Sequence, residues 1–139
     1  KSGKGIMPRF SARSQQNLST CHDDLQRVME QVVKVWDCTI LCGHRDEITQ
    51  NRAYYGDPQR SKVKWPDSKH NSLPSMAVDA APYPIDWGDL ERFRRFAWFV
   101  KGVATGMGIT VRLGADWDSD NDIKDQNFHD LPHIELVAR

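Results

Sequence analysis

The chain has 139 residues, which suits a single domain with one hydrophobic core. Lysine and arginine together number 19, as do aspartate and glutamate, so the formal net charge is zero. This balance argues against a general nucleic-acid binder, which usually carries a basic excess, and no apolar run is long enough to cross a membrane as a helix.

The first residues carry no pattern typical of secretion. They lack the succession of basic, apolar and small residues that marks a signal peptide, and KSGKGI before Met7 resembles the remnant of a tag. We therefore expect residues 1–6 to lie outside the fold and one domain to span residues 7–139. An odd number of cysteines without a secretory signal predicts reduced thiols in a cytoplasmic product; they are Cys21, Cys38 and Cys42.

The first half of the chain predicts one helix, one strand and one long loop. STCHDDLQRVMEQVVKVW is the helix, with Thr20 as N-cap and Asp23 three residues later. Apolar residues follow at helical spacing, at Leu25, Val28, Met29 and Val32. CTILC predicts a short buried strand ended by Gly43. Residues 57–75 are polar and rich in proline, so we expect a long loop, and such loops in compact domains are often functional.

The second half predicts a strand, a helix and two further strands. SMAVDAAPYP holds a strand that its two prolines stop. DLERFRRFAWFVKGVATGMG is the clearest helix, with a cap near Asp89, an end at Gly106 and one apolar stripe. ITVRLG and HIELVA are strands on either side of an acidic loop at residues 115–130. Strands that pair across helices without regular alternation suggest an α+β domain.

Asp79 stands within an apolar run, between Val78 and Ala80. A buried carboxylate without a partner is costly, so this side chain should be paired, protonated or bound to a cation. One interpretation is an ion pair with a basic residue, or an exposed strand end before Pro82. The other is a metal ligand, which requires further ligands elsewhere in the chain.

Histidines supply candidates for those ligands. His70 precedes the strand that holds Asp79, and His133 begins the final strand. Two histidines and one carboxylate, with water in the fourth position, form a common catalytic zinc set. Imidazole and carboxylate together suit zinc better than calcium or magnesium.

The segment HDLPH, residues 129–133, superficially matches the two-histidine zinc motif of helices. Pro132 would disrupt such a helix and the glutamate of the motif is missing, so His129 and His133 are not expected to bind one metal from a helix. Asp130 then has two interpretations. It is either a general base within reach of a metal-bound water or an ordinary turn aspartate.

Two further acidic features also have two interpretations each. Glu135 shares a strand face with His133 by alternation, so it either orients that ligand or is an ordinary strand residue. The loop segment DWDSDND spaces its aspartates like the first half of a calcium loop but lacks the final glutamate. It is either a solvated loop or a weak calcium site built from Asp116, Asp118, Asp120 and Asp122.

Several of these segments together resemble a known family. SKHNSLPSMAVD and DLPHIEL are similar to the signature and the closing element of the zinc D-Ala-D-Ala carboxypeptidase and dipeptidase family. The nearest branch is that of phage endolysins that cleave the L-alanyl-D-glutamate bond of peptidoglycan. The resemblance runs from Met7 to the C-terminus, and the other segments that carry it are FSARSQQNLSTCHDDLQ, GHRDEITQ and AVDAAPYPIDW. The chain departs from the wider family in a longer interval between histidine and aspartate and in Ser75, which stands at a usual glycine.

The resemblance implies a role for individual residues. Asp130 matches the acid that activates the zinc-bound water, and Arg45 matches an arginine that steadies the scissile carbonyl oxygen. Ser68 matches a serine beside the ligands that contacts the substrate. The positions that match the zinc ligands are His70, Asp79 and His133.

The resemblance also implies a fold and a function. The fold is a single small domain of the hedgehog and D-Ala-D-Ala peptidase type, with a mainly antiparallel sheet, two main helices and long active-site loops. The function is that of a monomeric zinc endopeptidase that accumulates in the host cytoplasm and reaches the wall peptidoglycan after holin-type release, without nucleic acid or membrane insertion. Two alternatives remain: a D-alanyl-D-alanine carboxypeptidase with the same metal site, or a non-catalytic module that binds cell wall or calcium.

Overall fold

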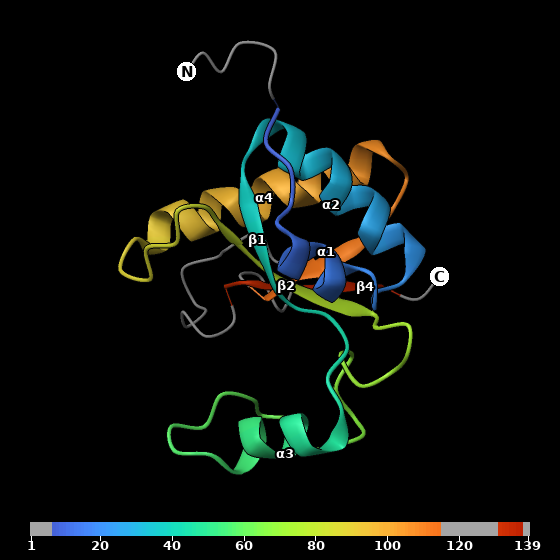
Figure 1. The fold of residues 1–139 in the computed structure, drawn as a ribbon, viewed down its shortest axis with the longest axis vertical. Coiled ribbons are helices and arrows are strands. Elements are labelled where there is room, and N and C mark those ends of the chain that lie inside the picture. Colours follow the sequence, from blue (N-terminus) through green and yellow to red (C-terminus); the bar gives the residue numbers. More distant parts are fainter. Residues whose placement is uncertain (1–6, 115–130, 138–139) are drawn as a thin grey trace.

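The computed structural model describes residues 7–114 and 131–137 of the chain. These residues form an α+β domain, as predicted (Figure 1). The elements are α1 (Ala12–Leu18), α2 (Asp23–Val35), β1 (Cys38–Cys42), α3 (Glu47–Tyr55), β2 (Ala77–Pro82), α4 (Leu90–Gly106), β3 (Val111–Leu113) and β4 (His133–Leu136). Within the described ranges, no helix has the length and apolar character needed to cross a membrane.

The strands form one antiparallel sheet in the order β1-β2-β4-β3. β4 is the last of the described strands, yet it lies inside the sheet and places His133 directly opposite Asp79 of β2. Because side chains alternate between the faces of a sheet, Asp79, His133 and Glu135 share one face. The other face carries Val78, Ala80 and Ile134.

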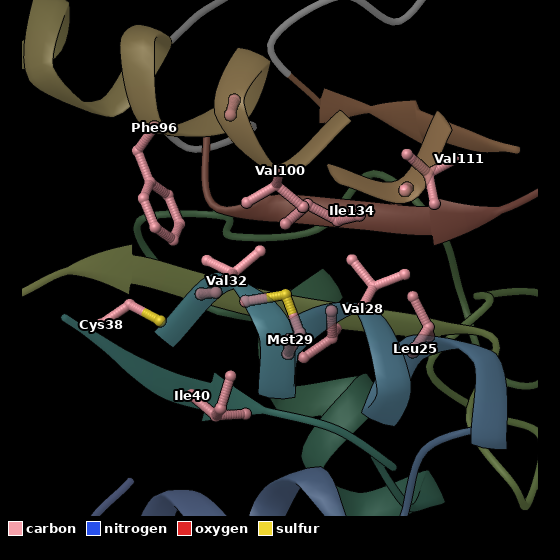
Figure 2. Packing of buried hydrophobic residues seen from close by; sticks show 14 of the residues in the cluster. Leu25, Val28, Met29, Val32, Cys38, Ile40, Phe96, Val100, Val111 and Ile134 are labelled. Carbon is pink, nitrogen blue, oxygen red and sulfur yellow. The ribbon is translucent and has the colours of Figure 1, made fainter. Parts of the chain in front are cut away.

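The hydrophobic core lies on this second face, where the sheet packs against α2 and α4 (Figure 2). Trp36 meets Phe96 edge to face, with ring centroids 5.4 Å apart. Buried residues from the two helices belong to the same core cluster as Ile134; they include Leu25, Val28, Met29, Val32, Phe96 and Val100. The core therefore packs against one face of β2 and β4. The face that carries Asp79 is left for the loops to cover.

The start of α2 differs from the prediction. His22, not Thr20, is the N-cap, and its Nδ1 accepts a hydrogen bond of 3.0 Å from the backbone nitrogen of Asp24. Thr20 instead pairs with a distant part of the chain. Its carbonyl accepts a hydrogen bond from the backbone nitrogen of Ser75, beside an isolated bridge between Ser75 and Cys21. This long-range pairing keeps residues 20–22 out of the helix. By contrast, α4 begins after the cap at Asp89, as predicted.

Helices α1 and α3 were not predicted. Both are short, and their buried residues form no apolar stripe: α1 buries Ser14 and Leu18, and α3 buries Gln50 and Ala53. Figure 1 shows α3 extending away from the sheet, followed by the long chain segment that returns to β2. That segment, residues 57–75, contains no helix and only the isolated bridge at Ser75, in agreement with the predicted loop.

Candidate metal centre

Three side chains from two neighbouring strands and the long loop converge on one point. Asp79 lies on β2, His133 lies opposite it on β4, and His70 comes from the loop before β2. One ligand atom from each residue lies within 4.8 Å of the other two. The structure therefore brings together the two histidines and the carboxylate that were predicted to be metal ligands.

His70 is held rigidly in place. Its side chain is almost completely buried, and Nδ1 lies 2.7 Å from the carbonyl oxygen of Gly43. The backbone nitrogen of His70 also donates to Oγ of Ser68 at 3.2 Å. These contacts direct the remaining ring nitrogen, Nε2, to Asp79, where it lies 3.2 Å from Oδ1.

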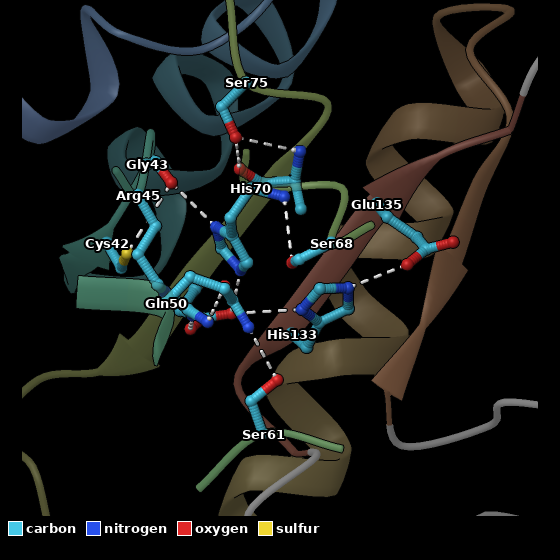
Figure 3. A network of polar contacts seen from close by, with 12 residues as sticks. Cys42, Gly43, Arg45, Gln50, Ser61, Ser68, His70, Ser75, His133 and Glu135 are labelled. Atoms are coloured by element: carbon cyan, nitrogen blue, oxygen red, sulfur yellow. Dashed lines mark hydrogen bonds and ion pairs between the residues drawn. The ribbon is translucent and has the colours of Figure 1, made fainter. Parts of the chain in front are cut away.

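His133 is oriented by an acidic neighbour on its own strand. Its Nε2 lies 2.8 Å from Oε1 of Glu135, and its Nδ1 lies 3.3 Å from Oδ1 of Asp79. Glu135 in turn accepts a hydrogen bond of 3.0 Å from Nη2 of Arg112 on β3. Figure 3 shows His133 between Glu135 and the centre of the network. The sequence left two interpretations of Glu135 open. In the structure its carboxylate contacts the ring of His133, as expected for a residue that orients this ligand candidate.

The charges of the cluster are strongly coupled. Burial alone would raise the pKa of Asp79, but the charge of His70 and the hydrogen bonds from both histidines hold it well below its usual range. Burial alone would lower the pKa of His70, but Asp79 raises it to about 10. The pKa of His133 is raised in the same way against burial, by Asp79 and Glu135. The protonation of the three side chains is therefore coupled: Asp79 favours the charged form of each imidazole, and the imidazoles favour the ionised form of Asp79.

The donor set fits a divalent transition metal. The two ring nitrogens that face Asp79 are Nε2 of His70 and Nδ1 of His133, and the opposite nitrogen of each ring contacts a carbonyl or a carboxylate. This is the usual arrangement of metal-binding histidines, because the second contact fixes the tautomer and the ring orientation. Two imidazoles and one carboxylate leave a fourth tetrahedral position for water or substrate.

The side chain of Arg45 also contacts this centre, through Asp79. Its Nη2 lies 3.5 Å from Oδ2 of Asp79, so the ion pair that was the simpler interpretation of Asp79 is also present. Its Nη1 donates to Oε1 of Gln50 on α3 at 2.9 Å. Arg45 therefore stands beside the three ligand candidates with a guanidinium group that is fixed at one end.

Some predicted site residues lie outside the described residues, and some residues near the site were not predicted. The candidate acid Asp130 and the candidate calcium ligands at 116–122 lie outside the described residues. Cys42 borders the site, because it lies opposite Asp79 in the register of β1 and β2. Its side chain is partly buried. Sequence reasoning missed Gln50 and Arg112, since neither a buried glutamine nor an arginine on a short strand produces a local pattern.

Comparisons with known proteins point to one family. A model of the family described as phage L-alanyl-D-glutamate peptidase matches residues 6–137. The L-alanyl-D-glutamate peptidase of Escherichia phage T5 is 30% identical over 143 aligned positions, which cover 93% of this chain and 98% of that protein. The crystal structure of the Serratia marcescens L-Ala D-Glu endopeptidase ChiX shares the fold, with a TM-score of 0.69 and 24% identity over 96% of this chain and 94% of that chain.

Proposed function

The chain belongs to the phage L-alanyl-D-glutamate peptidase family, and from this premise we propose that it is a peptidoglycan endopeptidase that hydrolyses the L-alanyl-D-glutamate bond of stem peptides. The observation that carries the proposal is the convergence of His70, Asp79 and His133 on the face of the sheet opposite the hydrophobic core. Such a donor set has little structural purpose, since the domain already has a core on the opposite face.

We propose zinc as the resident metal, held by Nε2 of His70, a carboxylate oxygen of Asp79 and Nδ1 of His133. The argument rests on the donor atoms, which suit zinc better than calcium or magnesium. A bound zinc ion supplies Lewis-acid chemistry and lowers the pKa of a water molecule towards neutrality. Glu135 holds the His133 ring by accepting from its Nε2, so it serves the ligand and not the substrate.

The remaining roles fall to residues of the chain that meet the substrate. Asp130 takes a proton from the attacking water at its carboxylate and passes it to the departing amine, as a general acid and base must. Arg45 stabilises the negative charge that develops on the scissile carbonyl oxygen, because its guanidinium lies beside the ligand cluster. Ser68 accepts a hydrogen bond from the His70 backbone nitrogen, and we propose that it also contacts the substrate.

We propose further that the protein acts as a monomer in host lysis. It would be made in the host cytoplasm and reach the wall after holin-type release, with peptidoglycan as its partner. Calcium binding by Asp116, Asp118, Asp120 and Asp122 stays a prediction. Calorimetric titration of the zinc-loaded protein with calcium tests it, and absence of heat would exclude a calcium site.

The function is tested by mass spectrometry of muropeptides released from purified peptidoglycan. We expect stem peptides with a free N-terminal D-glutamate, and we expect their loss after treatment with a chelator and their return with added zinc. Release of terminal D-alanine alone would assign a carboxypeptidase instead. No new product from folded, zinc-loaded protein would leave a non-catalytic binding module as the remaining function.

A further inference from the structure

Gln50 is the one completely buried polar residue of α3 within the described part of the chain. The helix extends away from the sheet, and several of its other side chains are exposed, so a buried amide is unexpected here (Figure 1). A buried amide is stabilising only when its donors and acceptors are satisfied. The partners of Gln50 therefore indicate why it is there.

The carboxamide of Gln50 joins three segments of the chain. Its oxygen accepts from Nη1 of Arg45 at 2.9 Å and from Nδ2 of Asn71 at 3.1 Å. Its nitrogen donates to the carbonyl oxygen of Val63 at 2.6 Å and to Oγ of Ser61 at 2.9 Å. Figure 3 shows the amide between Ser61 and the group formed by Arg45 and His70. Both ends of the amide are thus engaged, each with two partners.

These contacts bear directly on the orientation of Arg45. The guanidinium has two terminal nitrogens, and Gln50 holds Nη1 while Nη2 lies 3.5 Å from Asp79. The backbone around it is also fixed, because Arg45 donates its backbone nitrogen to the carbonyl of His70 and accepts from Asn71 Nδ2 at its own carbonyl. A long cationic side chain next to a carboxylate has many alternative rotamers, and only a second fixed contact selects one.

We propose that Gln50 is a positioning residue for Arg45, which it holds at the metal centre while its amide nitrogen ties the loop at residues 61–63 to the same point. The inference rests on the proposed function, in which Arg45 faces the scissile carbonyl. Among the described residues, the side-chain hydrogen bonds of Gln50 go to Arg45, Asn71 and the loop, and none of them goes to a ligand candidate. The loop and the catalytic arginine are thereby fixed by one side chain.

The two halves of the amide can be tested separately. Gln50→Leu removes both halves at similar volume. Gln50→Glu keeps two acceptor oxygens for Arg45 and Asn71 but removes the donors to Val63 and Ser61. Ser61→Ala is the matched control, because it removes only contacts on the loop side, those of Ser61 Oγ with Gln50 and Val63, and leaves the bond between Gln50 and Arg45 intact.

The first measurement is independent of substrate. Nitrogen-15 spectra of the guanidinium groups, with the Arg45 signal assigned from its loss in Arg45→Ala, report whether rotation of that group is hindered. We expect separate, slowly exchanging Nη signals in the wild-type protein, in Gln50→Glu and in Ser61→Ala, and averaged signals in Gln50→Leu. A hindered Arg45 in folded Gln50→Leu, or an averaged Arg45 in the wild-type protein, would overturn the inference.

The second measurement is a double-mutant cycle on kcat for stem-peptide release. We expect Arg45→Ala to lower kcat by on the order of 10²-fold, as removal of a group that stabilises an oxyanion does. If Gln50 acts through Arg45, adding Gln50→Leu to Arg45→Ala lowers kcat little further, and Gln50→Glu restores most of the loss seen in Gln50→Leu. If the decreases in kcat of the two single variants multiplied in the double variant, while melting temperature and zinc content stayed unchanged, the inference would be contradicted. A wild-type protein that releases no peptide would refute the proposed function alone, and the spectra would still decide the role of Gln50.

Discussion

Asp79 and His133 are directly opposed on the antiparallel strands β2 and β4, and Oδ1 of Asp79 lies 3.3 Å from Nδ1 of His133. The pairing of the two strands therefore determines the distance between two of the three ligand candidates. A slip of one residue in either strand would move its side chain to the opposite face and into the hydrophobic core. The candidate metal centre and the sheet consequently depend on the same hydrogen-bond register.

Replacement of Asp79 by asparagine removes the central charge of the cluster at constant size. We expect Asp79→Asn to lose stoichiometric zinc, with an affinity loss greater than the roughly 10- to 100-fold typical of residues behind the ligands. Zinc content by elemental mass spectrometry and kcat/KM for stem-peptide release measure this. The control is Asp67→Asn, an exposed position in the loop that precedes β2. Full zinc content in Asp79→Asn would show that Asp79 serves only as the ion-pair partner of Arg45.

Glu135 is expected to affect the metal through His133. In Glu135→Ala the His133 ring loses the acceptor at 2.8 Å that fixes its orientation, so we predict a decrease in zinc affinity of about 10- to 100-fold. Glu135→Gln should fall between this variant and the wild type, because its amide oxygen still accepts from Nε2. Competition with a zinc-binding dye measures the affinities. Glu91→Ala, which changes a glutamate in the exposed first turn of α4, is the control, and an equal effect there would refute the prediction.

The metal affinity should depend on pH through His70. Because Asp79 raises the pKa of His70 in the metal-free protein to about 10, the ring is protonated at neutral pH and a metal ion must displace that proton. The apparent zinc affinity should therefore rise with pH through neutrality and level off above the pKa of His70. Calorimetric titrations in two buffers of different ionisation enthalpy measure the protons released at pH 7. Zinc binding without proton release would show that His70 is neutral in the metal-free protein.

Asp130 should affect catalysis and leave the metal in place. Loss of a general acid and base typically lowers the rate by about 10²- to 10⁴-fold, and we expect a decrease of kcat in this range for Asp130→Asn. Zinc content and melting temperature should match the wild type. Asp125→Asn, nearby in the same acidic segment, is the control. If the two variants were equally active, Asp130 would be an ordinary turn residue.

The core behind the sheet should determine stability independently of the site. Phe96 is 2% exposed and packs against Trp36, so Phe96→Ala should lower the free energy of unfolding by about 3–5 kcal/mol. Urea unfolding followed by tryptophan fluorescence measures this. Phe99→Ala, a partly buried neighbour on α4, should cost less. At low temperature the Phe96→Ala protein should still bind zinc, since its cavity lies on the face opposite Asp79.

The elements that could be predicted are those with a local pattern. The strand at Cys38–Cys42 and the helix at Leu90–Gly106 carry a short apolar run and a continuous apolar stripe, and both are confirmed. Helix α3 has no such stripe, because its main buried side chain is the amide of Gln50, and a buried amide is defined by partners in a distant loop. The cap of α2 was wrong for a similar reason, since Ser75 pairs with Thr20 from another part of the chain.

The candidate site was predictable only in part. Alternation along the last strand correctly placed Glu135 on the face of His133, which a single strand determines. The proximity of His70 to Asp79 depends on how a loop without regular structure folds back, and here the family resemblance supplied what periodicity does not. Arg112 and Gln50 were missed because each acts through a side chain that is close only in three dimensions.

The position of β4 inside the sheet has a consequence for synthesis. Every described element except β4 precedes residue 115, and β4 supplies one of the three ligand candidates while covering the edges of both β2 and β3. A nascent chain that has not yet released β4 from the ribosome cannot assemble the metal centre, and its partial sheet leaves two edges unpaired. The candidate metal centre is therefore completed only when this one short strand pairs between β2 and β3.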